Sequence, residues 1–458
     1  MRRKHAFFFL TCFLFLLRCA YADDTLAERF QNLPSLARGP CAVLRIDSLD
    51  ADTALERMAQ LSGMGFGGVL LAIATSDDTT WEKISKLANR ASELRLELGI
   101  QDFPLSTNEP PTSGGTIDVF DEKAFPQHIN KLLSGLQTRL DRHYGKTLTW
   151  ILMKSQPDAA HARPQDLAEL FFKQTGLRLA PSQLTLEIDT VGDPISAAYT
   201  KEKIALITAD AWRTRFAGQA RETVQEAGLE AGIMANELLM PPEEAANYFM
   251  RPVLFGCTTS ATERVFNKRI ANGAQAAARH VTIMGHLPLE RVQPIDVPTQ
   301  FASKHEMDKL FLDGATSLLL DSGATEWQDE DLFADPDIAC LYARRWQFIL
   351  QQSSPFDAPS ITWQTRETNV DMRAITRKRS REHIYCIVNN SPHSGSITGI
   401  FPETINGTPP EYWSAENGEI IPLNAAVQTS ATQTSIRLFI EPHGAFFVVF
   451  KQPAPPAN

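Results

Sequence analysis

Short, almost continuous apolar segments alternate with helix-like segments through residues 40–352. The clearest is Gly68–Ala74 (GVLLAIA), because a strand buried on both faces of a parallel sheet shows no polar alternation. Before it, Leu55, Met58 and Leu61 recur at helical spacing, and a second helical pattern follows it. Strand–helix repetition of this kind predicts a parallel sheet covered by helices.

About eight such strand–helix units can be traced. The predicted strands are Cys41–Asp47, Gly68–Ala74, Glu97–Asp102, Leu148–Met153, Leu229–Ala235, Val253–Phe255, Val281–Met284 and Ser317–Leu320. Helices are expected near 165–175, 200–227, 262–279 and 305–312, and Thr53 and Thr79 are expected to begin capping boxes with Glu56 and Glu82. Leu184–Val191 fits either a strand of the same sheet or an inserted hairpin. This size and repetition favour an α/β fold of the (β/α)8 TIM-like barrel type over 40–352.

The periodicity changes after Pro355. Ile384, Cys386 and Val388 alternate with other residues, and Asn417-Gly418 is typical of a tight hairpin turn. These patterns predict a small all-β sandwich domain over 365–452. The basic run Arg373–Arg381 just before them is expected to face solvent.

The first 22 residues have the pattern of a secretory signal peptide. Basic residues precede the apolar run Ala6–Leu17, and Ala20 and Ala22 place small residues before the expected cleavage site. The net charge of −10 becomes more negative once this basic segment is removed. We therefore expect an acidic protein that is exported, periplasmic or extracellular, with no membrane segment after cleavage. The absence of a basic stripe argues against nucleic acid as a partner.

No motif indicates a metal or a cofactor. Cys41, Cys257, Cys340 and Cys386 lack C-x-x-C spacing and are expected to be buried free thiols. Gly63–Gly68 matches G-x-G-x-x-G but follows a helix and precedes a strand, which is the reverse of a dinucleotide site. We interpret it as the end of a helix and a tight loop, and expect no cofactor and no metal.

Several segments, in order, resemble glycoside hydrolase family 106, the α-L-rhamnosidase family. They are LERMAQLSGMGFGGVLL (Leu55–Leu71), WEKISKLANRASELRLELGIQD (Trp81–Asp102), LAELFFKQTGLRL (Leu167–Leu179), Ile270–Met284, Trp413–Gly418 and IEPHGAFFVVF (Ile440–Phe450). The resemblance implies a barrel followed by a β module and a carbohydrate ligand.

The catalytic residues of that family are not matched. Where the family carries Asp-Ser-aromatic-Glu after its fourth strand, this sequence has Lys154-Ser155-Gln156-Pro157. No glutamate stands at the expected place after Met284, and Asp321 occurs where the family usually has a histidine. The resemblance therefore implies the scaffold with a degenerate active site.

Active sites of such barrels form at the carboxyl ends of the strands. Glycoside hydrolysis needs two carboxyl groups there, one acid and one base or nucleophile. The candidate catalytic residues are Glu237, Glu290 and Asp321, and the candidate substrate-binding residues are Asp102, Lys154, Asn236 and His286. Asn236-Glu237 resembles the Asn-Glu pair of many retaining barrel glycosidases.

Three functions stay open at this point. The first is a glycoside hydrolase with relocated carboxylates, and the second is a non-catalytic protein that binds glycans on the same scaffold. The third is a structural or interaction protein without a sugar ligand. The oligomeric state cannot be predicted from these patterns.

Overall fold

The structure is a computed structural model of the 458-residue chain. It describes residues 25–33, 39–47, 49–73, 77–101, 124–153, 164–178, 199–200, 203–204, 207, 221–234, 253–256, 283–288, 299–321, 336–351, 361–365, 370–379 and 381–451. The chain divides into two compact units. The N-terminal unit comprises residues 38–343 and 355–357, and the C-terminal unit comprises 1–37, 344–354 and 358–458.

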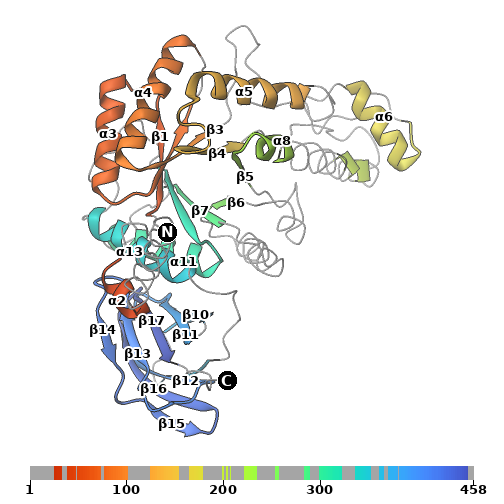
Figure 1. The fold of residues 1–458 in the computed structure, drawn as a ribbon. Helices are drawn as coiled ribbons and strands as arrows, with labels where there is room; N and C mark the ends of the chain where they lie inside the picture. Colours follow the sequence, from red (N-terminus) through yellow and green to blue (C-terminus); the bar gives the residue numbers. More distant parts are fainter. Residues whose placement is uncertain are drawn as a thin grey trace, which may run out of the picture. The chain divides into compact units, whose positions relative to one another are not determined.

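The N-terminal unit contains a parallel central sheet (Figure 1). Its strands are β1 (Cys41–Arg45), β2 (Gly68–Ala72), β3 (Glu97–Gln101), β4 (Leu148–Met153), β5 (Glu230–Met234), β6 (Val253–Gly256), β7 (Ile283–Pro288) and β8 (Ser317–Asp321). Each strand pairs with the next along the chain, and β1 also pairs with β8 through Cys41↔Leu319 and Ala42↔Leu320. The α/β class and the parallel sheet are as predicted.

The predicted strands agree with the observed ones except at β7. The apolar pattern placed that strand at Val281–Met284, whereas β7 runs from Ile283 to Pro288. The prediction was wrong because Gly285 and His286 were interpreted as a loop, although both pair in register with β8, at Leu318 and Leu319. His286 therefore lies within the strand. The ambiguous segment Leu184–Val191 lies outside the described residues.

Helices α3 (Ala51–Gly63), α4 (Asp78–Leu94), α5 (Ala124–Leu140), α6 (Pro164–Thr175), α8 (Arg221–Glu226) and α11 (Thr299–Leu312) belong to the same unit. The predicted capping boxes at Thr53 and Thr79 are wrong. Asp50 caps α3 by accepting from the backbone N–H of Thr53 at 2.8 Å, and Asp77 caps α4 by accepting from Thr80 N–H at 2.7 Å. The aspartates lie three residues before those N–H groups, where a cap side chain reaches them.

The glycine-rich segment after α3 is a helix end and loop, as expected. α3 ends at Gly63, Gly65 has φ 92°, and β2 begins at Gly68. A positive φ is readily adopted only by glycine. The interpretation as a dinucleotide motif is therefore excluded by the local order of helix, loop and strand.

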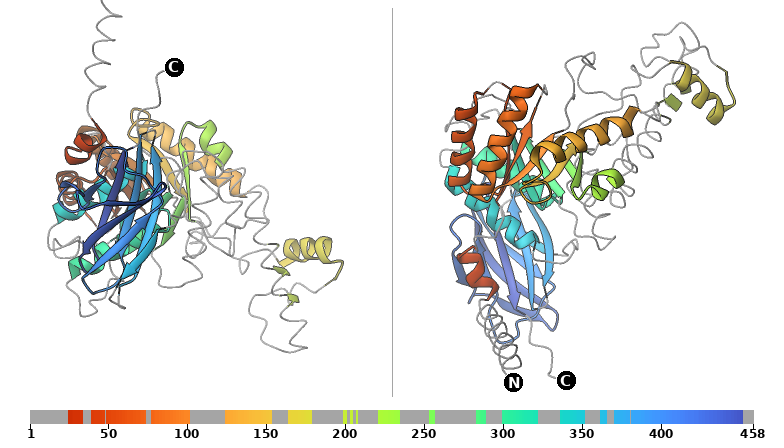
Figure 2. Two further views of the ribbon diagram at one scale, coloured as in Figure 1. Left: turned by 90° about the horizontal axis from the view of Figure 1, so that it is seen from below. Right: turned by 45° about the horizontal axis from the view of Figure 1, so that its top comes forward.

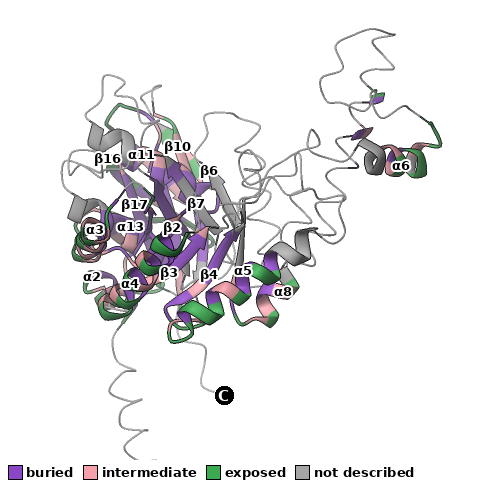
Figure 3. Cartoon of the chain, turned by 90° about the horizontal axis from the view of Figure 1, so that it is seen from above, coloured by how far each residue is buried: buried purple, intermediate pink, exposed green. Residues whose placement is uncertain are grey.

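Side chains from several strands of the parallel sheet form one apolar cluster. Its members are Cys41, Val43, Leu70, Trp150, Leu152 and Leu319, from β1, β2, β4 and β8. Gly99 of β3 makes room for the indole of Trp150, because a Cβ there would lie 2.3 Å from that ring. Figure 3 shows the buried strands and the exposed outer faces of α3 and α4.

The C-terminal unit consists of two antiparallel sheets (Figure 2). One has the order β10-β11-β17-β13-β14 and the other β15-β16-β12-β9. The strands are β9 (Thr362–Thr365), β10 (Met372–Arg379), β11 (Glu382–Asn389), β12 (Gly395–Phe401), β13 (Glu411–Ser414), β14 (Ile420–Pro422), β15 (Val427–Ser430), β16 (Gln433–Ile440) and β17 (Ala445–Lys451). One apolar core joins both sheets, with Tyr385 and Phe446 on one side and Phe401 and Leu438 on the other. The predicted Asn417-Gly418 turn connects β13 to β14, with Gly418 at φ 75°.

Two helical segments complete this unit. α2 (Leu26–Gln31) begins with a capping box between Thr25 and Glu28. Its Phe30 ring packs on Trp413 and Phe447, with centroids 4.9 and 5.7 Å apart. The division between the units falls within α13 (Pro336–Gln351), whose Trp346 also contacts Phe447 at 4.9 Å.

The basic run Arg373–Arg381 is not uniformly solvated. Arg377, in β10, is 3% exposed, and burial beside the Cys386 thiol lowers its pKa to about 10. The same burial raises the pKa of Cys386 to about 12. Cys41, Cys340 and Cys386 are buried thiols, as expected, while Cys257 lies outside the described residues. Among the described residues, no helix is long and apolar enough to cross a membrane.

Candidate functional site

The carboxyl ends of all eight parallel strands lie at one edge of the sheet, since each strand pairs in parallel with its neighbour. The candidate catalytic and substrate-binding residues are predicted at this edge. β1 ends at Arg45 and β8 ends at Asp321, and these two strands pair with each other. The last residues of β1 and β8 therefore form the described part of the candidate site.

Arg45 and Asp321 form a bidentate ion pair. Arg45 Nη2 donates to Asp321 Oδ2 at 3.0 Å, and Arg45 Nη1 donates to Asp321 Oδ1. The Asp321 side chain is 9% exposed and that of Arg45 is 32% exposed. Paired guanidinium and carboxylate groups of this geometry are the stronger class of charged hydrogen bond.

The geometry limits what Asp321 can do chemically. Both carboxylate oxygens accept hydrogen bonds from Arg45, which is the role of an ionised carboxylate rather than of a proton donor. Asp321 is thus suited to balance charge, to orient a neighbouring group or to act as a base. It does not fit the general acid of a glycosidase.

The segment after β1 is tied to the rest of the unit at the same edge. Lys83, from α4, donates to the backbone carbonyls of Ile46, at 2.7 Å, and of Leu49. The Ile46 N–H donates to the Ala72 carbonyl at the end of β2 at 3.2 Å. These contacts hold the backbone beyond Arg45 in place, so the position of the Arg45 guanidinium is supported from two elements.

The other acidic residues at this edge have local roles. Asp47 is exposed beyond the end of β1. Asp77 caps α4, and hydrogen bonds from Thr79 and Thr80 lower its pKa to about 2. Asp78 is exposed and lies 3.5 Å from Arg139. None of these three carboxylates is held in a buried setting, so none has the environment of a catalytic acid.

Two of the seven predicted site residues lie within the described part of the chain. Of the candidates, Asp321 is at the end of β8 and His286 is within β7, in register with Leu319. The others lie outside the described residues: Asp102, Lys154, Asn236, Glu237 and Glu290. No group of three or more histidine, cysteine, aspartate or glutamate side chains among the described residues is arranged to hold a metal ion.

Arg45 was missed by reasoning from the sequence. It follows the apolar run Cys41–Leu44, and the candidate residues named from the sequence do not include it. A basic residue directly after an apolar strand was the available signal. Its partner could not be predicted, because pairing of β1 with β8 joins residues from distant parts of the chain.

Comparison with solved structures gives a match over nearly the whole chain. The rhamnosidase from Novosphingobium sp. PP1Y superposes with a TM-score of 0.71 at 10% sequence identity, covering 94% of this chain and 84% of that chain. The maltogenic α-amylase AmyB from Thermotoga neapolitana, at 10% identity, covers 91% of this chain and 100% of that chain with a TM-score of 0.48. No family model and no curated protein matches the sequence. The chain thus has a glycoside-hydrolase-like fold.

Proposed function

We propose that this chain is an exported glycoside-hydrolase-like protein that acts on glycans at the carboxyl edge of its parallel sheet. The observation that carries the proposal is the likeness to a rhamnosidase over 94% of this chain, at a TM-score of 0.71. The match covers both the parallel-sheet unit and the antiparallel sheets. The fold of an enzyme does not fix its reaction, so the substrate has to be tested.

The proposal includes a closed (β/α)8 barrel for the N-terminal unit. Pairing of β1 with β8 supports it, as does the apolar cluster that unites Leu70 of β2, Trp150 of β4 and Leu319 of β8. Barrel interiors are filled by layers of side chains from alternate strands. A barrel of this kind brings the residues that follow β5, β7 and β8 to one mouth.

In this proposal Glu237 is the general acid or base. It follows β5 in the sequence, and Asn236 beside it would bind a sugar hydroxyl. Glu290 or Asp321 would supply the second carboxylate, and Asp321 suits that role because Arg45 holds it as an anion. Asp102, Lys154 and His286 would contact the substrate.

The test is turnover of aryl α-L-rhamnosides and of plant or bacterial polysaccharides by the full chain. If one is hydrolysed, Glu237→Gln should lower kcat about 10²-fold or more, because a proton-transfer group is lost while the shape is kept. Glu226→Gln, an exposed position on α8, is the control and should leave kcat unchanged. Unchanged kcat in Glu237→Gln would overturn the assignment.

A second candidate is a glycan-binding protein that does not catalyse hydrolysis. The observation that favours it is the stretch Lys154–Pro157, which stands where the family that this sequence resembles carries a catalytic glutamate. Glycan binding without turnover of any substrate would support this candidate. If the chain neither binds nor hydrolyses any glycan, an interaction protein without a sugar ligand would be favoured.

A further inference from the structure

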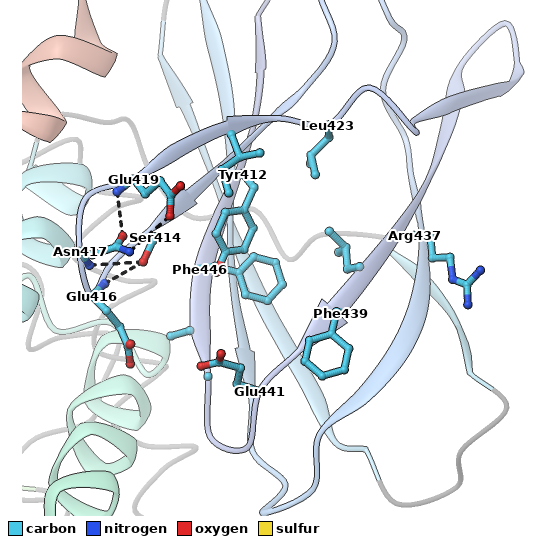
Figure 4. A pocket seen from close by; sticks show the side chains of 14 residues that line it. Tyr412, Ser414, Glu416, Asn417, Glu419, Leu423, Arg437, Phe439, Glu441 and Phe446 are labelled. Atoms are coloured by element: carbon cyan, nitrogen blue, oxygen red, sulfur yellow. Dashed lines mark hydrogen bonds between the residues drawn. The ribbon is translucent and has the colours of Figure 1, made fainter.

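A cavity of about 390 Å³ opens in the C-terminal unit and is lined by residues other than those of the candidate site (Figure 4). It is lined by residues of β13, β14, β16 and β17 and of the turns beside them. Its volume is within the range of small-molecule sites. Both sheets of the sandwich contribute to it, because β16 belongs to one sheet and β13 and β17 to the other.

The pairing of the strands explains why the cavity is open. β15 pairs with β16 only through Gln433–Ser435, so the following residues of β16 lie at the edge of their sheet. Arg437, Leu438 and Phe439 line the cavity from that edge. On the opposite side, β14 is three residues long and ends the other sheet.

The apolar part of the cavity is aromatic. The rings of Tyr412 and Phe446 are stacked, with centroids 5.1 Å apart and an angle of 29° between their planes. Phe439 is 68% exposed, although a phenylalanine gains free energy when covered. Figure 4 shows its ring among the side chains that line the cavity. Flat aromatic faces suit a ring with apolar C–H edges and a cation.

The polar part of the cavity is acidic. Glu416, Glu419 and Glu441 line it, whereas the lining contains one basic residue, Arg437, whose side chain points away in Figure 4. Burial, followed by the charges of Glu441, Glu416 and Glu419, raises the pKa of Tyr412 to about 12. The three carboxylates and Tyr412 line the same cavity, so a positive group is favoured there and a negative one is not.

We propose that this cavity binds an amino sugar with a free ammonium group. The sugar ring would lie against Tyr412 and Phe439, with the Tyr412 ring held in place by its stacking on Phe446. The ammonium group would lie among Glu416, Glu419 and Glu441, and the sugar hydroxyls would donate to the remaining carboxylate oxygens. This inference does not depend on catalysis in the N-terminal unit, because all of these residues belong to the C-terminal unit.

Calorimetry on the full chain with two matched probes tests the proposal. The probes are the trimer of glucosamine and the trimer of N-acetylglucosamine, which differ in the charge of the amino group. At mildly acidic pH the amine of the glucosamine trimer is protonated. One solvent-screened charge contact at about 4 Å changes Kd about fivefold, so the glucosamine trimer should bind at least about fivefold more tightly. Its advantage should shrink as salt is raised.

Variants locate the site. Phe439→Ala and Glu441→Gln change exposed side chains and should each weaken binding of the glucosamine trimer about fivefold or more. Val427→Ala, at a 61% exposed position outside the cavity lining, is the control and should leave Kd unchanged. Glu237→Gln should leave this Kd unchanged as well, which separates the inference from the proposed function.

Four results would overturn the proposal. One is that the glucosamine trimer does not bind. A second is equal affinity for the two trimers, which would exclude recognition of the ammonium group. A third is that spermidine binds as tightly as the trimer, which would show that the sugar ring contributes nothing. The fourth is unchanged affinity in both Phe439→Ala and Glu441→Gln.

Discussion

The Arg45–Asp321 pair is a bidentate interaction between charged side chains in the described part of the sheet's carboxyl edge. It joins the ends of β1 and β8, and its carboxylate is 9% exposed. A charge that is largely removed from water is costly unless its partner is present. The pair therefore has a structural role whether or not the edge carries out chemistry.

At this scale we predict that Asp321→Asn lowers the free energy of unfolding by about 1–2 kcal/mol, since Arg45 stays partly solvated and the full cost of a buried charge does not apply. Urea titration followed by tryptophan fluorescence measures it. Glu93→Gln, which breaks the exposed Arg90–Glu93 pair, is the control and should cost less than about 0.5 kcal/mol. In an Arg45→Met background Asp321→Asn should cost less than in the parent, and equal costs would contradict the pairing argument.

At the scale of elements, the turn between β13 and β14 is fitted closely to α13. Gly418 has φ 75°, and a Cβ there would lie 2.8 Å from the Arg345 guanidinium. That guanidinium donates to the Ala415 carbonyl at 3.1 Å and to the Glu416 carbonyl. A glycine is thus needed at position 418 for two reasons: it adopts the positive φ of the turn, and it leaves room for the Arg345 side chain.

We predict that Gly418→Ala destabilises the protein more than Gly407→Ala does. Both glycines have positive φ, but a Cβ at Gly407 would have no atom within 4 Å. Gly407→Ala should cost about 1 kcal/mol from backbone strain alone, and Gly418→Ala about 1–2 kcal/mol more from displacement of Arg345. Thermal unfolding of the two variants side by side measures the difference. Equal losses would mean that Arg345 moves aside freely.

The N-cap of α4 makes the stability of this helix depend on pH. Hydrogen bonds from Thr79 and Thr80 lower the pKa of Asp77 from 3.8 to about 2. A carboxyl group with a depressed folded-state pKa stabilises the fold above its unfolded pKa, and this contribution is lost as the pH falls through the folded value. The window for Asp77 is therefore from about pH 4 down to about pH 2.

We predict that Asp77→Ala lowers the melting temperature at pH 7, and that the difference from the parent shrinks as the pH falls through this window. Circular dichroism at helix wavelengths over a pH series measures both melting temperatures. Asp47→Ala replaces an exposed acidic residue outside any helix and is the control. A difference that stays constant down to pH 2 would show that the cap acts without its charge.

Local sequence patterns predicted most of the strands. They failed where contacts between distant parts of the chain determine the structure. The apolar runs gave β1 to β6 and β8 within one or two residues, because a doubly buried strand leaves a clear signal. They misplaced β7, where Gly285 and His286 look like a loop but are held by pairing with β8. Arg377 looked solvated within a basic run, and it is buried because β10 pairs with β11 beside Cys386. The Arg45–Asp321 pair likewise needed the β1–β8 pairing.

At the scale of the whole molecule we predict export. The signal peptide proposed for residues 1–22 should be removed after Ala22, because small residues occupy the positions that a signal peptidase recognises. Intact-mass and N-terminal mass spectrometry of the secreted protein should find Asp23 first. Changing Ala22 to a bulky residue should leave the precursor uncut, and an acylated Cys19 in the parent would contradict the prediction.

The position of α2 has a consequence for how the chain is made. Phe30 is synthesised long before Trp413 and Phe447, the rings that pack on it. These contacts can therefore form only after β17 has left the ribosome. Because contacts between residues far apart in the sequence form slowly, we expect the packing around Phe30 to be a late step in the folding of the C-terminal unit.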